Sequence, residues 1–124
     1  MIPKHILVID DEQLVTESIR RLLKKQGYNV TIAESGIDAI EKVKIKESGF
    51  DLIIADIRMP EMDGIEIIKK LREIVRKPTP EILITGYASD ESLKQAEELN
   101  VADYIYKPFD ITEFLNLVRK NLGK

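Results

Sequence analysis

The fold is indicated most directly by residues 51–56, DLIIAD, where four apolar residues lie between two aspartates. The same pattern, a largely apolar run that ends in charged residues, occurs at residues 6–11, ILVIDD, and at residues 104–108, YIYKP. In a parallel sheet the carboxyl ends of all strands lie on one edge, where ligands bind. Charged residues that are far apart in the chain can therefore converge there on one site.

Short apolar runs alternate five times with longer segments of helical periodicity. We expect strands at residues 5–9, 29–33, 51–55, 81–85 and 103–106. We expect helices at residues 13–26, 36–47, 64–75, 89–99 and 111–122. Such alternation is typical of a parallel sheet whose two faces are both covered by helices.

The predicted fold class is α/β, a doubly wound, flavodoxin-like (βα)5 domain with a five-stranded parallel sheet in the order 2-1-3-4-5. Right-handed crossovers would place the first and fifth helices on one face of the sheet and the other three on the opposite face. The second helix is expected to bury Ile37, Ile40 and Val43. The fourth helix has little apolar surface, so it should be the helix most free to shift.

The composition bounds the class of protein. A length of 124 residues with 44% hydrophobic and 33% charged residues predicts one globular domain over residues 1–124. No apolar run approaches the roughly 20 residues that a membrane span needs, and the start of the chain lacks the features of a secretory signal, so we expect a cytoplasmic protein without a membrane segment. The absence of cysteine excludes disulfides and thiol catalysis. A net charge of −3 gives no basic footprint for direct binding of nucleic acid.

Four short motifs follow the predicted strands in order: the acidic pair Asp10-Asp11, residues 56–64 (DIRMPEMDG), residues 85–88 (TGYA) and residues 107–109 (KPF). Together they resemble the receiver domain of bacterial response regulators, and the resemblance covers nearly the whole chain. Each motif alone occurs by chance, but four of them in the right order at the right strand ends form a specific signal.

Three residues are expected to carry the chemistry. Asp56 is the predicted phosphoacceptor, because a carboxylate can attack phosphorus and form an aspartyl phosphate. Lys107 offers a compact ammonium that can pair with Asp56 before the reaction and with a phosphoryl oxygen after it. Thr85 can donate its hydroxyl to a phosphoryl oxygen. The resemblance implies a cis peptide bond before Pro108 and names Tyr104, three residues before the lysine, as the switch aromatic.

The same strand ends predict an all-oxygen metal site. Asp11 and Asp56 would hold the cation directly, Asp10 through a bound water, and the backbone carbonyl of Arg58 would supply another oxygen. Mg²⁺ suits such a site, with Mn²⁺ as an alternative. Clustered carboxylates repel one another, so we expect the site without metal to be electrostatically unfavourable.

The expected function is that of a phosphoacceptor in a two-component signal transduction system. The resemblance implies a sensor histidine kinase or phosphotransfer protein as donor and an effector protein or domain as downstream partner. Phosphorylation would draw Thr85 inward, admit Tyr104 to the vacated space and change the surface formed by residues 89–99, 103–106 and 111–122. The protein would be a monomer or weak homodimer, and it would catalyse only its own phosphorylation and dephosphorylation.

Two other functions fit parts of the pattern. A Mg²⁺-dependent phosphatase also uses an aspartyl phosphate, but such enzymes commonly place a second aspartate two residues after the nucleophile, where this chain has Arg58. The chain could also be a receiver-like module that makes protein contacts without phosphorylation. The acidic pair, Asp56, Thr85 and Lys107 argue against that second alternative.

Overall fold

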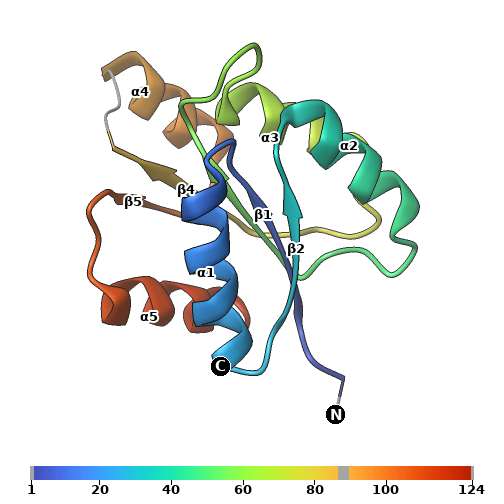
Figure 1. Cartoon of the computed structure of the whole chain (residues 1–124). Coiled ribbons are helices and arrows are strands. Elements are labelled where there is room, and N and C mark those ends of the chain that lie inside the picture. The colour runs from blue at the N-terminus through green and yellow to red at the C-terminus, as the bar shows by residue number, and fades with distance from the viewer. Residues whose placement is uncertain (1, 87–89, 124) are drawn as a thin grey trace.

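A computed structural model describes residues 2–86 and 90–123 of the chain. Five strands alternate with five helices (Figure 1): β1 (His5–Ile9), α1 (Gln13–Lys25), β2 (Asn29–Ala33), α2 (Gly36–Ile45), β3 (Leu52–Asp56), α3 (Gly64–Arg72), β4 (Glu81–Thr85), α4 (Asp90–Leu99), β5 (Asp103–Tyr106) and α5 (Ile111–Asn121). The strands form one parallel sheet in the order β2-β1-β3-β4-β5, which confirms the predicted topology.

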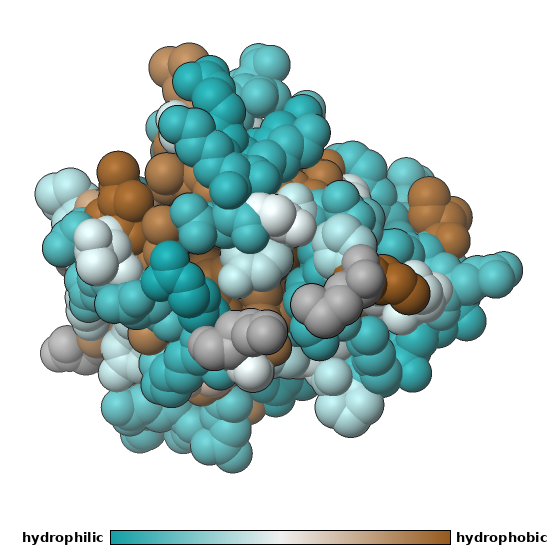
Figure 2. Space-filling view, turned by 90° about the horizontal axis from the view of Figure 1, so that it is seen from below, coloured by the Kyte–Doolittle hydropathy of each residue, from teal (hydrophilic) through white to brown (hydrophobic). Residues whose placement is uncertain are grey.

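Helices cover the sheet on both faces, with α1 and α5 on one side and α2, α3 and α4 on the other (Figure 1). Successive strand residues point to opposite faces, so the central strands are apolar throughout. In β1, for example, Ile6 and Val8 pack with Phe114 of α5, whereas Leu7 and Ile9 pack with Ile67 of α3. Hydrophilic residues cover most of the face seen from below in Figure 2, with hydrophobic residues in separate small patches.

Helix α2 confirms the predicted buried face only in part: Val43 is buried and Ile40 packs partly buried against the core, but Ile37 does not. Its buried residues are Gly36, Ala39 and Val43, whereas Ile37, which was expected in the core, is 62% exposed. Gly36 packs closely against the β3–α3 loop and the start of α3, because a Cβ added at Gly36 would lie 2.6 Å from Sδ of Met62 in the loop and 3.0 Å from Cγ1 of Ile67 in the helix. The glycine therefore faces the core, and the neighbouring isoleucine points to solvent.

Four helices end earlier than predicted, α1 and α5 by one residue each and α2 and α3 by more. Helix α2 ends at Ile45 rather than residue 47, since Lys46 already has an extended backbone. Helix α3 ends at Arg72 rather than residue 75, and its C-cap, Glu73, donates its N–H to carbonyls of the last turn. The predicted start of the fourth helix at residue 89 lies outside the described residues.

The loop between β3 and α3 is fixed close to Asp56. Asp63 is the N-cap of α3 and accepts a hydrogen bond from the N–H of Glu66 at 2.9 Å. The N–H of Gly64 donates to the carbonyl of Ile57 at 2.8 Å, and a Cβ at Gly64 would overlap the backbone carbonyl of Asp56. Only glycine lets the start of α3 pack this closely on the end of β3.

We predict that Gly64→Ala lowers the free energy of unfolding by about 1–3 kcal/mol, because the added methyl group must displace backbone atoms that cannot rotate away. Urea unfolding measures this loss. Gly86→Ala is the matched control, since its Cβ would meet Lys107 at 3.9 Å, an ordinary contact distance. Equal stability of the two variants would contradict the close packing of Gly64 on Asp56.

Candidate functional site

The carboxyl edge of the sheet brings the predicted charged residues together. Asp10 follows the last residue of β1, Asp56 is the last residue of the adjacent strand β3, and Lys107 follows β5. The two aspartates are buried, with 2% exposure for Asp10 and 6% for Asp56. Three positions that are distant in the sequence therefore lie in one site.

Donors contact both carboxylate oxygens of Asp56. Nζ of Lys107 donates to Oδ2 at 3.1 Å, and the backbone N–H of Arg58 donates to Oδ1 at 3.1 Å. The same Nζ lies 3.7 Å from Oδ2 of Asp10. Asp56 is therefore oriented by the side chain of Lys107, directly after β5, and by the backbone of the loop that follows β3. The same ammonium group of Lys107 connects Asp56 to Asp10, directly after β1.

Glu12 also belongs to this site, although it was not among the predicted residues. Oε1 of Glu12 lies 3.8 Å from Nζ of Lys107. Among the described residues, Asp10, Glu12 and Asp56 each offer one carboxylate oxygen to a group in which these oxygens lie within 4.8 Å of one another. The only indication in the sequence that Glu12 belongs to the site is its position directly after the acidic pair. That indication is weak, because the helix dipole favours acidic side chains at the start of any helix.

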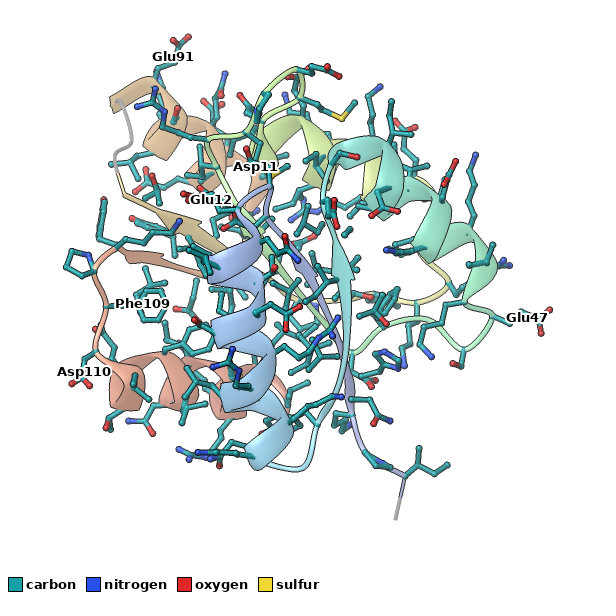
Figure 3. All side chains as sticks on the ribbon, in the orientation of Figure 1. Asp11, Glu12, Glu47, Glu91, Phe109 and Asp110 are labelled. Carbon is teal, nitrogen blue, oxygen red and sulfur yellow. The ribbon has the colours of Figure 1, made fainter. Side chains whose placement is uncertain are left out.

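Asp11 lies on the same turn between β1 and α1 (Figure 3). Its side chain is exposed, and it is not part of the close group of Asp10, Glu12 and Asp56. Its role as a direct metal ligand, and that of the Arg58 carbonyl, therefore stays a prediction. Binding through Asp11 would require its carboxylate to turn toward that group.

The remaining predicted residues lie on β4 and β5 or directly after β5. Thr85 is fully buried at the end of β4, and the peptide bond between Lys107 and Pro108 is cis, as the resemblance implies. Tyr104 on β5 is 36% exposed and meets Tyr106 edge to face, with 6.2 Å between ring centroids. Residues 87–88 of the TGYA motif lie outside the described residues.

The local charges shift two pKa values in the site. Burial raises the pKa of Asp10 to about 6; a hydrogen bond from the Glu12 N–H opposes this shift, and the negative charge of Asp56 adds to it. Burial alone would lower the pKa of Lys107, but the hydrogen bond and negative charge of Asp56 outweigh it, so the pKa is raised. Lys107 thus stays charged, whereas Asp10 keeps its proton up to a higher pH than an ordinary aspartate and ionises near pH 6.

This donor set fits a hard divalent cation. Its side-chain ligand atoms are all carboxylate oxygens, which Mg²⁺ prefers. Three carboxylates surround one ammonium, so the cluster has an excess of negative charge that a cation would offset. The pKa of Asp10, raised mainly by burial, is raised further by the negative charges of Asp56 and Asp11.

Comparisons with known proteins all indicate the same family. A family model for the response regulator receiver domain matches residues 6–119. The transcriptional regulatory protein CrdR of Helicobacter pylori is 34% identical over 110 residues, which cover 89% of this chain and 51% of that protein. A CheY-like response regulator receiver domain protein from Methanospirillum hungatei superposes with a TM-score of 0.91 at 30% identity, covering 98% of this chain and 95% of that one.

A further solved structure is similar and contains a metal. The receiver domain of the sensor histidine kinase PA1611 from Pseudomonas aeruginosa, with a magnesium ion coordinated in its active site cleft, has a TM-score of 0.85 at 25% identity and covers 99% of this chain and 100% of that one. The present chain spans about half the length of CrdR. None of the helices in the described part of the chain is long and apolar enough to cross a bilayer.

We predict that Asp10→Asn stabilises the metal-free protein above pH 6 by about 2 kcal/mol. Because the pKa of Asp10 is raised, the folded protein retains a proton that the unfolded chain has released, so the wild-type free energy of unfolding should fall as pH rises from about 4 to about 6. Asparagine keeps the acceptor for the Glu12 N–H and removes the charge.

Urea unfolding in the presence of a chelator, measured between pH 4 and pH 8, tests this expectation. Added Mg²⁺ should stabilise the wild type and leave Asp10→Asn largely unchanged. A variant that is less stable than the wild type at pH 8 without metal would show that Asp10 is not held in an unfavourable charged state.

Proposed function

The chain belongs to the family of response regulator receiver domains, and we propose that it accepts a phosphoryl group on Asp56 and transmits this event through the surface formed by α4, β5 and α5. The observation that carries the proposal is the placement of Asp56, a buried carboxylate at the carboxyl end of the central strand, with Nζ of Lys107 at 3.1 Å. Such a pair offers a nucleophile and a charge that can follow the phosphoryl group.

The proposed step is a transfer of the phosphoryl group to a carboxylate oxygen of Asp56. A new P–O bond forms while the P–N bond of a phosphohistidine on the donor breaks, and the imidazole leaves with the electron pair and takes up a proton. Later, water attacks phosphorus, which releases inorganic phosphate and restores the carboxylate. Lys107 would remain within reach of the anionic oxygens throughout, because its Nζ contacts both Asp56 and Asp10.

A divalent cation, Mg²⁺ or alternatively Mn²⁺, would be held by Asp10, Asp11, Asp56 and the backbone carbonyl of Arg58. When bound, it would supply positive charge against the phosphoryl oxygens. The excess of carboxylates around Lys107 supports this proposal, as does the magnesium ion in the similar PA1611 receiver domain. The remaining positive charge would come from Lys107 itself.

Thr85 and Tyr104 are the proposed switch residues. The Thr85 hydroxyl, buried at the end of β4, would donate to a phosphoryl oxygen, and the half-exposed Tyr104 on the neighbouring strand would turn inward. Helix α4 is the element that would move in response. Among the residues whose burial is described, Ala96 is its one fully buried apolar residue, so few contacts oppose a shift.

The biological setting follows from the same proposal. This domain would act in the cytoplasm, where a sensor histidine kinase or phosphotransfer protein would supply the phosphoryl group and an effector protein or domain would read the α4–β5–α5 surface. CrdR is described as a transcriptional regulator, which supports an effector as the downstream partner. We do not expect this domain to bind nucleic acid directly or to turn over external substrates.

Asp56→Asn should abolish labelling by acetyl phosphate in the presence of Mg²⁺ and leave the fold intact, because asparagine keeps an acceptor for the Arg58 N–H. Intact mass spectrometry measures the label. Asp110→Asn is the matched control, since asparagine caps α5 as well as aspartate does and the variant should label like the wild type. Undiminished labelling of Asp56→Asn at another residue would refute the assignment.

Lys107→Ala should still accept some phosphoryl group on Asp56 but fail to pass the signal to α4. Amide NMR spectra recorded with and without phosphorylation would show this as unshifted α4 resonances. Lys120→Ala serves as control, because it removes an exposed pairing with Asp103 at 3.3 Å, away from the phosphoacceptor. A full wild-type shift in Lys107→Ala would remove Lys107 from the switching mechanism.

A further inference from the structure

Glu12 occupies the N-cap of α1 without capping the helix. Its backbone is extended, as an N-cap requires, but its side chain accepts no hydrogen bond from the first turn. Serine, threonine, aspartate and asparagine are the residues that stabilise this position, and glutamate is not among them. Capping therefore gives no reason for a glutamate here, and the helix dipole favours only a negative charge near this end, not a particular direction of the side chain.

The Glu12 carboxylate is instead turned toward the phosphoacceptor site. It lies 3.8 Å from Nζ of Lys107, and the Glu12 N–H donates to Oδ1 of Asp10 at 2.9 Å, which fixes the backbone from which the side chain extends. Its oxygen comes within 4.8 Å of those of Asp10 and Asp56. Figure 3 shows Glu12 at the start of α1, next to the turn that carries Asp11.

The Glu12 carboxylate is much more exposed to solvent than the two neighbouring carboxylates. The side chain of Glu12 is 64% exposed, whereas those of Asp10 and Asp56 are 3% and 7% exposed. Glu12 is thus the outermost of the three, at the mouth of the site. A phosphodonor that approaches Asp56 from solvent must come close to this negative charge before its phosphoryl oxygens reach the ammonium group of Lys107.

We propose that Glu12 is a specificity-determining residue that selects against small donors of high negative charge. The proposal rests on the phosphoacceptor function of Asp56 given above. The Glu12 carboxylate repels an incoming dianion more strongly than a monoanion, and at 3.8 Å from Nζ of Lys107 it partly offsets the charge that would attract either. At a separation of a few ångströms near the surface, one extra unit of charge changes a rate by about three- to tenfold.

Two small donors of different charge test the proposal. At pH 7 acetyl phosphate is a dianion and phosphoramidate is mainly a monoanion. In both, the bond from phosphorus to the leaving group breaks as the P–O bond to Asp56 forms, releasing acetate or ammonia. Labelling rates of Glu12→Gln should rise about three- to tenfold with acetyl phosphate and clearly less with phosphoramidate, and the difference should shrink as salt is added.

Two further variants separate charge from structure. Glu47→Gln removes an exposed glutamate in the loop after α2, far from Glu12 (Figure 3), so both its rates should equal those of the wild type. Glu12→Asp keeps the charge and should retain the preference for the monoanion. All measurements use saturating Mg²⁺, so that a change in metal affinity does not alter the rates.

The outcomes distinguish this inference from the function on which it rests. Suppose that the wild type takes the label on Asp56, but Glu12→Gln changes both rates by the same factor or changes neither. The selective role of Glu12 is then refuted, and the phosphoacceptor function of Asp56 still stands. If the wild type takes no label from either donor, the phosphoacceptor function fails and this inference fails with it.

Discussion

The ammonium group of Lys107 faces the carboxylates of Asp10, Glu12 and Asp56, and the arrangement of the site depends on this contact. One positive charge cannot neutralise three negative ones, so the site carries an excess of negative charge, and burial makes that excess costly. The raised pKa of Asp10 is one expression of that cost. A cation and a phosphoryl group would each change the balance, and the proposed response to phosphorylation rests on this change.

The fold tolerates an unfavourable charge cluster because its stability comes from apolar packing on the two faces of the sheet. Two apolar layers, one on each face of the sheet, hold β1, β3 and β5 in register, so that the ends of these strands keep their positions. The close packing of Gly64 on the backbone of Asp56 connects α3 to the same point. The site is therefore positioned by the core, and α4, with little buried apolar surface, is left as the element that can move.

Most of this architecture is predictable from the sequence, because apolar runs that alternate with segments of helical periodicity indicate a parallel sheet. The carboxyl ends of its strands then place Asp10, Asp56 and Lys107 on one edge. Side-chain direction is harder to predict. The exposure of Ile37 follows from contact between Gly36 and Met62, which only the packed structure reveals. Glu12 was missed because a glutamate at a helix start is ordinarily explained by the helix dipole, and its direction depends on the turn geometry.

The central claim is that Asp56 becomes an aspartyl phosphate in a site that needs a divalent cation. Reduction with borohydride converts an acyl phosphate into homoserine, so peptide mapping after phosphorylation of the wild type reveals both the residue and the linkage. Our account predicts homoserine at position 56 when Mg²⁺ is present and none when a chelator replaces it. Homoserine at another position, or equal conversion without the cation, would contradict it.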